Sequence, residues 1–592
     1  MSNYPRIQRI NSLVHRFAPL LLILFAAGYY GMYYRSSLNL GGEGGTVAVI
    51  AQRIIAGQRP IVDVFLGYNL MWFYPVVWLF QIFGPNYIAL RIFFFVLCTI
   101  TGLLGYRVVW RVTALPLYAL LIGGLLIFAP GMIFRNYMAL IGLLNILTLL
   151  EAYILPQRKL RFRLLWIMGA GIALSLTFLT RVEVGFFFLI LHAALILIFP
   201  IGPLNRLRSR LMVSGFAIIA TVFFFYLFHI PVYLDAQKRG FGYNFAAQYA
   251  EIPHMLTDYL KVYVAPKKNA PLPTPTIPSV APLEEQPATA TAAGPAASDP
   301  GTSPRPMLRD ILKVSFPTNL LVLGIYLPVL LVVLIISSTA AGFFYSLFKR
   351  DAKIRMCALA AATATGCALT FFPQYYFFRP DIPHLAEFMS PFIVALAICA
   401  FYVSGLFLGA KYLSLRILLA CFLLLAVLDV VAYVYYADKK PAAGTSAARR
   451  FRNIEFRGEN GVHVWLQKEE AAEVQGIYDT IMAHSGPNDY VICYPYSPTV
   501  NFMTNRRSYL HNLYVDNATS KSGFHDLVVK QVTEYQPAIL LIDNRAINKS
   551  DSSRFSSWAA ETYQFIRQNY KLVGTFGANE IYARPNKDSP TP

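Results

Sequence analysis

Charged residues are scarce in this chain of 592 residues: Asp, Glu, Lys and Arg make up only 14%, whereas 56% of the residues are hydrophobic. So little charge excludes an ordinary soluble protein, in which about 25% of residues are charged. Many separate apolar runs of about 20 residues can each cross about 30 Å of hydrocarbon, which predicts many spanning helices and excludes a single anchor. In such a protein the net charge of +20 does not indicate nucleic-acid binding.

Cysteines are few and isolated, which argues against a disulfide-stabilised protein and against a zinc-binding protein. No two of the six form a CxxC pair, so neither a disulfide framework nor a zinc site is expected, and we expect the thiols to pack in apolar surroundings. A nucleotide-binding glycine motif is also absent from the sequence. Five of the cysteines lie in apolar runs and one in the polar C-terminal part: Cys98, Cys357, Cys367, Cys399, Cys421 and Cys493.

The length of the apolar runs predicts a polytopic, all-α membrane domain with about eleven spans. The run Asn69–Phe83 is short, contains Pro75 and is rich in Trp and Tyr, so we interpret it as an interfacial helix. The expected spans are 17–34, 88–106, 115–133, 137–155, 164–180, 185–201, 211–231, 318–347, 356–373, 388–409 and 416–437.

Basic loops set the predicted orientation. If the run Asn69–Phe83 does not cross, the basic segments 107–111, 156–163, 203–210 and 348–355 share one side with the basic N-terminus. The positive-inside tendency makes that side the cytoplasm. The C-terminal part is then extracytoplasmic, as is the first loop, 35–87.

Composition divides the chain into a membrane domain, residues 1–437, and a soluble extracytoplasmic domain, residues 438–592. The outer loop 232–317 contains a Pro- and Ala-rich linker at about 265–306 that is unable to bury a core. In the soluble part, apolar strand-like runs alternate with helical patterns, which predicts a small α/β domain. The expected strands are 490–494, 538–543 and 572–576, and the expected helices are 468–484, 524–535 and 556–568.

A glutamate follows the first span directly. Glu43 stands between two glycine pairs in GGEGG and precedes an amphipathic stretch, 46–56, which places it close to the membrane surface. A carboxylate at headgroup level is suited to accept a proton from a substrate bound near the lipid. The alternative interpretation is a solvated loop glutamate.

The order of features after the first span resembles membrane glycosyltransferases of the GT-C class. An acidic residue is followed by a surface helix ending at Gly57, then Asp63, an aromatic interfacial helix, and the Phe83-Gly84 pair with Arg91 beyond it. More narrowly, this order is similar to the dolichyl-phosphate-mannose protein mannosyltransferases and the lipid A aminoarabinose transferases. The resemblance covers roughly residues 10–200, is weaker over the rest of the membrane part, and does not include the C-terminal domain.

The resemblance implies that Glu43 takes the acceptor proton in a one-step, inverting transfer. This sequence departs from the family pattern at two positions. In the first outer loop Gly44 stands in place of a second acid, and the turn after the third span has Arg135 where many relatives have an acid. The missing acid argues against a metal, so no cofactor is expected and Mg²⁺ or Mn²⁺ is not supported. Asp63 is expected to fix its loop by capping or by pairing with Arg59, with direct substrate contact as the alternative.

The departing lipid phosphate requires cationic groups on the same side of the membrane. Four candidates lie in expected outer turns: Arg135, Arg181, Arg379 and His384. Helix-end arginines also reach the interface without any such role. Glu183 is expected to pair with Arg181, with sugar binding as the alternative, and Asp381 is a supporting candidate.

The predicted function is transfer of a sugar from a polyprenyl-phosphate donor to a glycan, lipid or protein of the envelope, at the outer face of a bacterial cytoplasmic membrane. One alternative is a lipid or polysaccharide transporter, in which Glu151 and Asp429 would line a polar path. The simpler interpretation is that Glu151 forms an ion pair with the basic segment 156–163 and that Asp429 forms interhelical hydrogen bonds. A second alternative is an envelope sensor anchored by the spans, although about eleven spans exceed what anchoring requires.

Overall fold

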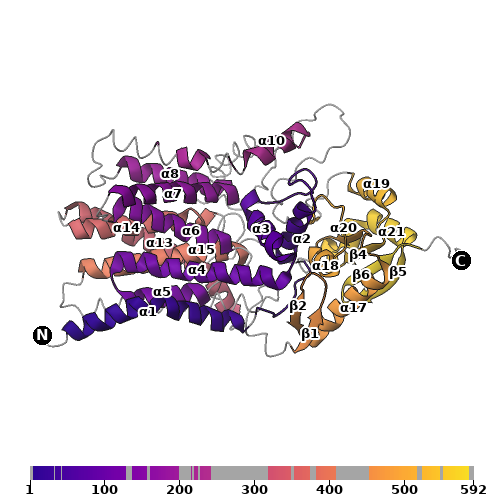
Figure 1. Cartoon of the computed structure of the whole chain (residues 1–592), viewed down its shortest axis with the longest axis horizontal. Helices are drawn as coiled ribbons and strands as arrows, with labels where there is room; N and C mark the ends of the chain where they lie inside the picture. Colours follow the sequence, from indigo (N-terminus) through magenta and orange to yellow (C-terminus); the bar gives the residue numbers. More distant parts are fainter. Residues whose placement is uncertain are drawn as a thin grey trace, which may run out of the picture.

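Most of the chain is described in a computed structural model, which places a helical bundle at one end and the C-terminal domain at the other (Figure 1). The N-terminus lies at the far end of the bundle and the C-terminus beyond the domain. The described residues are 4–32, 34–41, 43–128, 136–155, 160–198, 215, 219–223, 227, 229–241, 318–348, 352–373, 382–407, 453–515, 523–546 and 551–585.

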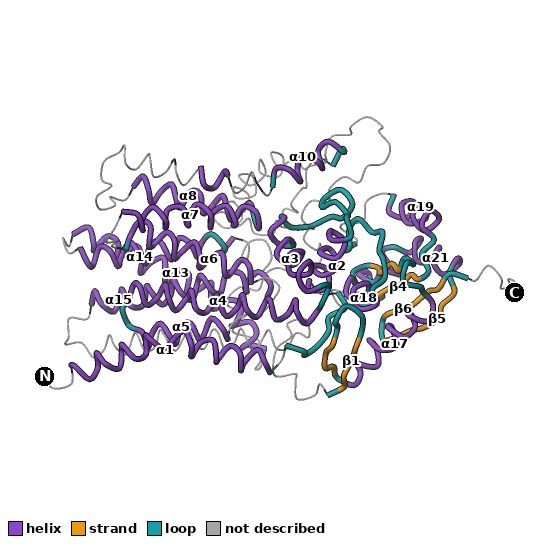
Figure 2. Tube along the Cα trace, viewed as in Figure 1, coloured by secondary structure: helices purple, strands orange, loops and turns teal. Residues whose placement is uncertain are grey.

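The bundle packs long apolar helices side by side (Figure 2). Helix α6 ends in a π-helical turn, Leu150–Ile154. The bundle helices are α1 (Tyr4–Gly31), α4 (Tyr87–Thr113), α5 (Pro116–Phe128), α6 (Asn136–Leu149), α7 (Leu160–Thr180), α8 (Val182–Ile198), α13 (Thr318–Phe348), α14 (Ala352–Leu369) and α15 (Ile382–Phe407).

Among the described residues, five helical stretches are long and apolar enough to cross a membrane. They lie in α1, α4, α6 with its π turn, α7 and α15, and each coincides with an expected span. Shorter apolar helices coincide with four more. Most of the expected span 211–231, all of 416–437 and the linker 265–306 lie outside the described residues.

The outer surface of the bundle is apolar, as a lipid-facing surface must be. On α1, Leu13, Leu20 and Leu24 are 50%, 51% and 58% exposed, and the stretch Asn11–Gly31 is buried over only 22% of its most apolar window. Exposed apolar area of this extent is costly in water and stable in hydrocarbon. The bundle is therefore a membrane domain.

The first loop forms a layer between the bundle and the C-terminal domain. It contains α2 (Glu43–Ile55), the 3₁₀ turn η1 (Leu70–Trp72) and α3 (Tyr74–Phe83). At about 1.5 Å per residue, α3 is about 15 Å long, half of what a span requires. The run Asn69–Phe83 is thus too short to cross, in agreement with its interpretation as an interfacial helix.

The C-terminal domain has a four-stranded mixed sheet in the order β3-β4-β6-β5 and a separate hairpin, β1-β2. Strands β3 and β4 are parallel, whereas β6 is antiparallel to both of its neighbours. The strands are β1 (Ile454–Arg457), β2 (His463–Leu466), β3 (Val491–Tyr494), β4 (Ile539–Asp543), β5 (Lys571–Phe576) and β6 (Asn579–Ala583). The helices are α17 (Lys468–His484), α18 (Pro498–Thr504), α19 (Phe524–Tyr535), α20 (Phe555–Trp558) and α21 (Ala560–Asn569), with a 3₁₀ turn, η8 (Asp551–Ser553).

Main-chain hydrogen bonds join the domain to the bundle. Ser37 N donates to Trp465 O over 3.0 Å, and Trp465 N donates to Arg35 O over 2.7 Å, so the chain leaving α1 pairs with strand β2. At the start of α4, Tyr87 N donates to Asn460 O over 2.9 Å. We call the end of the bundle that contacts the domain the domain end, and the opposite end the far end.

Arg91, which the sequence resemblance includes, fixes the chain between α1 and α2. Its side chain is 5% exposed and donates to the carbonyl oxygens of Tyr34, Ser36 and Ser37 over 3.1, 2.9 and 2.6 Å. A buried guanidinium that satisfies three carbonyl groups ties helix α4 to a segment without regular structure.

Replacing Arg91 with Leu should lower the free energy of unfolding by about 3 kcal/mol, because three carbonyl groups lose their donor. Five described cysteines are buried, so a thiol-reactive dye reports thermal unfolding in detergent. Arg107→Leu, at an exposed position of the same helix, is the matched control and should melt like the wild type. Equal melting of both variants would contradict the assigned role of Arg91.

Candidate functional site

Helix α2, which begins at Glu43, packs directly on the C-terminal domain. A Cβ atom at Gly45 would lie 2.0 Å from Thr499 Oγ1, and one at Gly41 would lie 2.7 Å from Tyr496 O. The close approach is held by Thr499 N, which donates to Leu40 O over 3.1 Å. Gly41 and Gly45, the first and last glycines of GGEGG, are therefore required for the contact with Tyr496 and α18, since a side chain at either position would collide with the domain.

Polar contacts continue along α2. The hydroxyl groups of Thr46 and Tyr496 lie 2.8 Å apart, and Gln52 Nε2 donates to Asn505 Oδ1 over 2.8 Å. The backbone of Glu43 thus starts a helix that is fixed along one side by the C-terminal domain. The side chain of Glu43 lies outside the described set, and its role stays a proposal.

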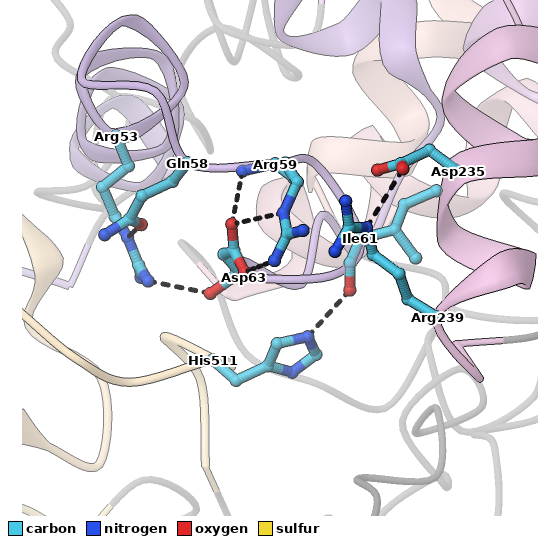
Figure 3. Close-up of polar contacts among 8 residues, drawn as sticks. All are labelled: Arg53, Gln58, Arg59, Ile61, Asp63, Asp235, Arg239 and His511. Atoms are coloured by element: carbon cyan, nitrogen blue, oxygen red, sulfur yellow. Dashed lines mark hydrogen bonds and ion pairs between the residues drawn. The ribbon is translucent and has the colours of Figure 1, made fainter.

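Asp63 forms the pair with Arg59 that the sequence predicts (Figure 3). Its carboxylate accepts from Arg59 Nη2 over 2.9 Å, from Arg59 Nε over 3.0 Å and from the Arg59 backbone N over 2.8 Å. The hydrogen bond from the Arg59 side chain is the main cause that holds the pKa of Asp63 below its ordinary value. Asp63 is thus engaged in closing its own turn.

Arg181 lies between α7 and α8 at the domain end and is 6% exposed. Its Nη2 atom is 3.1 Å from Glu387 Oε1, and its Nη1 atom is 3.5 Å from Glu183 Oε1. Glu387, in the second turn of α15, is only 1% exposed. Two carboxylates therefore balance one buried guanidinium, which a low dielectric requires.

Aromatic rings of the first loop cover this cluster. The Arg181 guanidinium carbon lies 5.5 Å from the ring centre of Tyr68 and 5.9 Å from that of Trp72. Asn69 Nδ2 donates to Phe178 O over 2.9 Å and attaches the same segment to α7. The first loop, the α7–α8 turn and the start of α15 therefore meet at Arg181, as cation–π contacts of this length indicate.

The third-span turn reaches the same place. Tyr137, in the first turn of α6, has its ring centre 6.0 Å from that of Trp72 and is 6% exposed. Arg135 precedes it by two positions and lies outside the described residues, as do Arg379 and Asp381. Of His384 only the helical backbone in α15 is described. Position 384 is one turn before Glu387, so both positions share a helix face.

The contact of Glu387 with Arg181 was not predicted from the sequence. Glu387 was visible only as the last residue of RPDIPHLAE, an acid entering an otherwise apolar helix. Glu183, by contrast, pairs with Arg181 as expected. Within the described part of the chain, no three His, Cys, Asp or Glu side chains are grouped as metal ligands.

Polar residues expected for a transporter lie elsewhere. Glu151, 1% exposed in the π turn, accepts from Arg111 Nε and Nη2 over 2.5 and 2.7 Å. Arg111 lies in the last turn of α4, so that helix supplies one partner of Glu151. The expected pairing of Glu151 with the basic segment 156–163 stays a prediction, because residues 156–159 lie outside the described residues. Asp429 lies outside the described residues.

Comparisons with known proteins find similar solved structures. No protein-family model matches it, and no curated protein is significantly similar. It is similar to the solved structure of ArnT from Cupriavidus metallidurans in the apo state, with 13% identity, a TM-score of 0.48 and coverage of 97% of this chain and 98% of that one. ArnT bound to undecaprenyl phosphate gives 15% identity, a TM-score of 0.46 and coverage of 96% and 98%.

A third similar structure is the apo oligosaccharyltransferase from Archaeoglobus fulgidus, with 13% identity, a TM-score of 0.46 and coverage of 97% of this chain and 75% of that one. These neighbours are GT-C glycosyltransferases, the class that the sequence resembles.

Glu387→Ala should lower the free energy of unfolding by about 3 kcal/mol, because the buried Arg181 loses its closest carboxylate. Glu183→Ala is the matched control. Its carboxylate is one-third exposed and 3.5 Å away, so its loss should cost less than about 1 kcal/mol. Thermal melting of both variants checks the order, and a larger loss for Glu183→Ala would contradict it.

The burial of His511 should make the folding stability of the protein depend on pH. Burial lowers its pKa from the ordinary 6.5, so the folded protein resists protonation. The stabilisation is then present above about pH 6.5 and is lost as the pH falls below it. His511→Gln should melt with a weaker dependence on pH between 7.5 and 5.5 than the wild type, whereas His484→Gln, at an exposed position, should not. Identical pH profiles for all three proteins would contradict the assignment.

Proposed function

We propose that the chain is a membrane glycosyltransferase that moves a sugar from a polyprenyl-phosphate carrier to an acceptor of the bacterial cell envelope. The observation that carries the proposal is the cluster of Arg181, Glu183 and Glu387 under the rings of Tyr68 and Trp72. Buried ion pairs beside aromatic rings at the end of a membrane bundle suit a sugar attached to a charged lipid head group.

Arg181 is already paired with two carboxylates, and this pairing decides which residues we assign to the lipid phosphate and which to the sugar. Among the described side chains of this cluster two are negative and one is positive, which disfavours a phosphate there, so we assign the lipid phosphate to Arg135, Arg379 and His384. The carboxylates of Glu183 and Glu387 are suited to accept hydrogen bonds from sugar hydroxyl groups, while Arg181 holds them in place. Asp381 stays a supporting candidate on the same turn.

In the proposed reaction Glu43 removes the proton of the acceptor hydroxyl as its oxygen attacks the anomeric carbon. The bond from that carbon to the phosphate oxygen breaks, and the polyprenyl phosphate leaves with the electron pair. Attack opposite to the leaving group inverts the anomeric configuration. Because the phosphate ester already activates the sugar, the proposed reaction requires no nucleotide.

The distribution of basic residues supports an extracytoplasmic site. Arg107 and Arg111 lie in the last turns of α4, and Arg161 and Arg163 lie in the first turn of α7, all at the far end. The positive-inside tendency makes the far end cytoplasmic, so we place the domain end on the outer face of the membrane.

A transporter is the less supported alternative. It requires Glu151 to face a polar path, whereas Glu151 is buried and paired with Arg111. That pairing stabilises the far end without opening a route between the ends of the bundle.

Purified protein in nanodiscs should transfer sugar from one member of a panel of synthetic polyprenyl-phosphate sugars. Glu43→Gln should lower kcat by about 10²- to 10⁴-fold, the usual contribution of a general base. Glu469→Gln, at an exposed position of α17, is the matched control and should keep full activity. Undiminished transfer by Glu43→Gln would remove the proposed base, and no transfer by the wild type from any donor would contradict the function.

A further inference from the structure

The loop that follows α2 contains a strained residue. Ile61 has φ of +72°, a left-handed conformation that a β-branched side chain rarely adopts. Its own turn supports it: Ile61 N donates to Val64 O over 2.9 Å, and Asp63 N donates to Arg59 O over 2.9 Å. Such strain persists only where the surroundings impose the conformation.

His511 of the C-terminal domain supplies part of that constraint. Its Nε2 atom donates to Ile61 O over 2.9 Å, and its own carbonyl oxygen accepts from Phe65 N over 2.7 Å. Both arms of the turn are therefore bonded to one residue of another domain, as Figure 3 shows for the first contact.

Arg53 supplies the rest. It lies in the last turn of α2, is 8% exposed, and donates Nη1 to Leu510 O over 2.6 Å and Nη2 to Asp63 O over 3.0 Å. Its Nε atom donates to Gln58 Oε1. One buried guanidinium thus joins α2, both arms of the turn and the C-terminal domain. Figure 3 shows its contacts with Gln58 and Asp63. Burial lowers its pKa to about 10, which leaves it charged at neutral pH.

The turn continues into the aromatic cover of Arg181. Only a few residues separate Phe65 from Tyr68, whose ring lies over the Arg181 guanidinium, and from Trp72. A displacement of the turn would move these rings relative to the ion pairs beneath them. Arg53 also fixes the end of α2, the helix that begins at Glu43.

We propose that Arg53 and His511 are positioning residues through which the C-terminal domain sets the geometry of the site at Arg181. In this arrangement the domain is an integral part of the catalytic unit and is required even for an acceptor that does not touch it. The effect on transfer rests on the proposed function, whereas the effect on the loop does not.

Hydrogen–deuterium exchange in nanodiscs tests the effect on the loop without any substrate. In Arg53→Met and in His511→Ala, peptides covering residues 57–72 should exchange about tenfold faster than in the wild type. Peptides covering β3 and β4 should not change, which shows that the domain is folded. Arg567→Met is the matched control, because this exposed arginine lies in the last turn of α21 and contacts the ring of Tyr563 in the same helix. Unchanged exchange at 57–72 in both test variants would overturn the proposal.

Kinetics of sugar transfer separate positioning from a loss of binding. Arg53→Met should lower kcat by about 10- to 100-fold, as small misplacements of reacting groups do, while the donor KM changes less than about threefold. Arg53→Lys, which retains a charged donor, should recover part of the rate. A kcat for Arg53→Met equal to that of Arg567→Met would overturn the proposal. If the wild type transfers no sugar, the proposed function is wrong. The exchange measurement still decides whether Arg53 and His511 constrain residues 57–72.

Discussion

The contact between α2 and α18 is the constraint on which the arrangement of the site depends. At Gly41 and Gly45 the first loop approaches the C-terminal domain so closely that no side chain would fit. Helix α2 packs on α3 and on the C-terminal domain, which it contacts through Tyr496 and Thr499 at one end and Leu510 at the other. The first loop of the membrane domain and the C-terminal domain, which are far apart in the sequence, thus form one structural unit around the candidate site.

Local patterns predicted much of the fold. Helices α17 and α19 have the expected bounds, 468–484 and 524–535, because their apolar periodicity is clear and polar turns flank them. The hairpin β1-β2 and strand β6 were not predicted. Strand β6, NEIYA, is short and carries two polar residues, so it is recognisable only from its place between β4 and β5.

The candidate site was predictable only where partners are close in sequence. The pairs Arg59–Asp63 and Arg181–Glu183 follow from spacings of four and two residues. The contact of Arg181 with Glu387 spans 206 positions, and no local pattern encodes it. The same holds for Arg53, an ordinary basic residue of an amphipathic helix in the sequence and a buried interdomain donor in the structure. Low dielectric at the end of the bundle makes such distant partners obligatory, but sequence spacing does not reveal which ones meet.

Photo-crosslinking with a polyprenyl phosphate that carries a diazirine beside its phosphate tests the central claim, that the lipid head group binds where the bundle meets the C-terminal domain. Saturable labelling should map to residues 57–72, to the turn around Arg181 and to the start of α15. Labelling at the far end instead, around Arg111 and Glu151, would contradict the account and favour a path across the membrane.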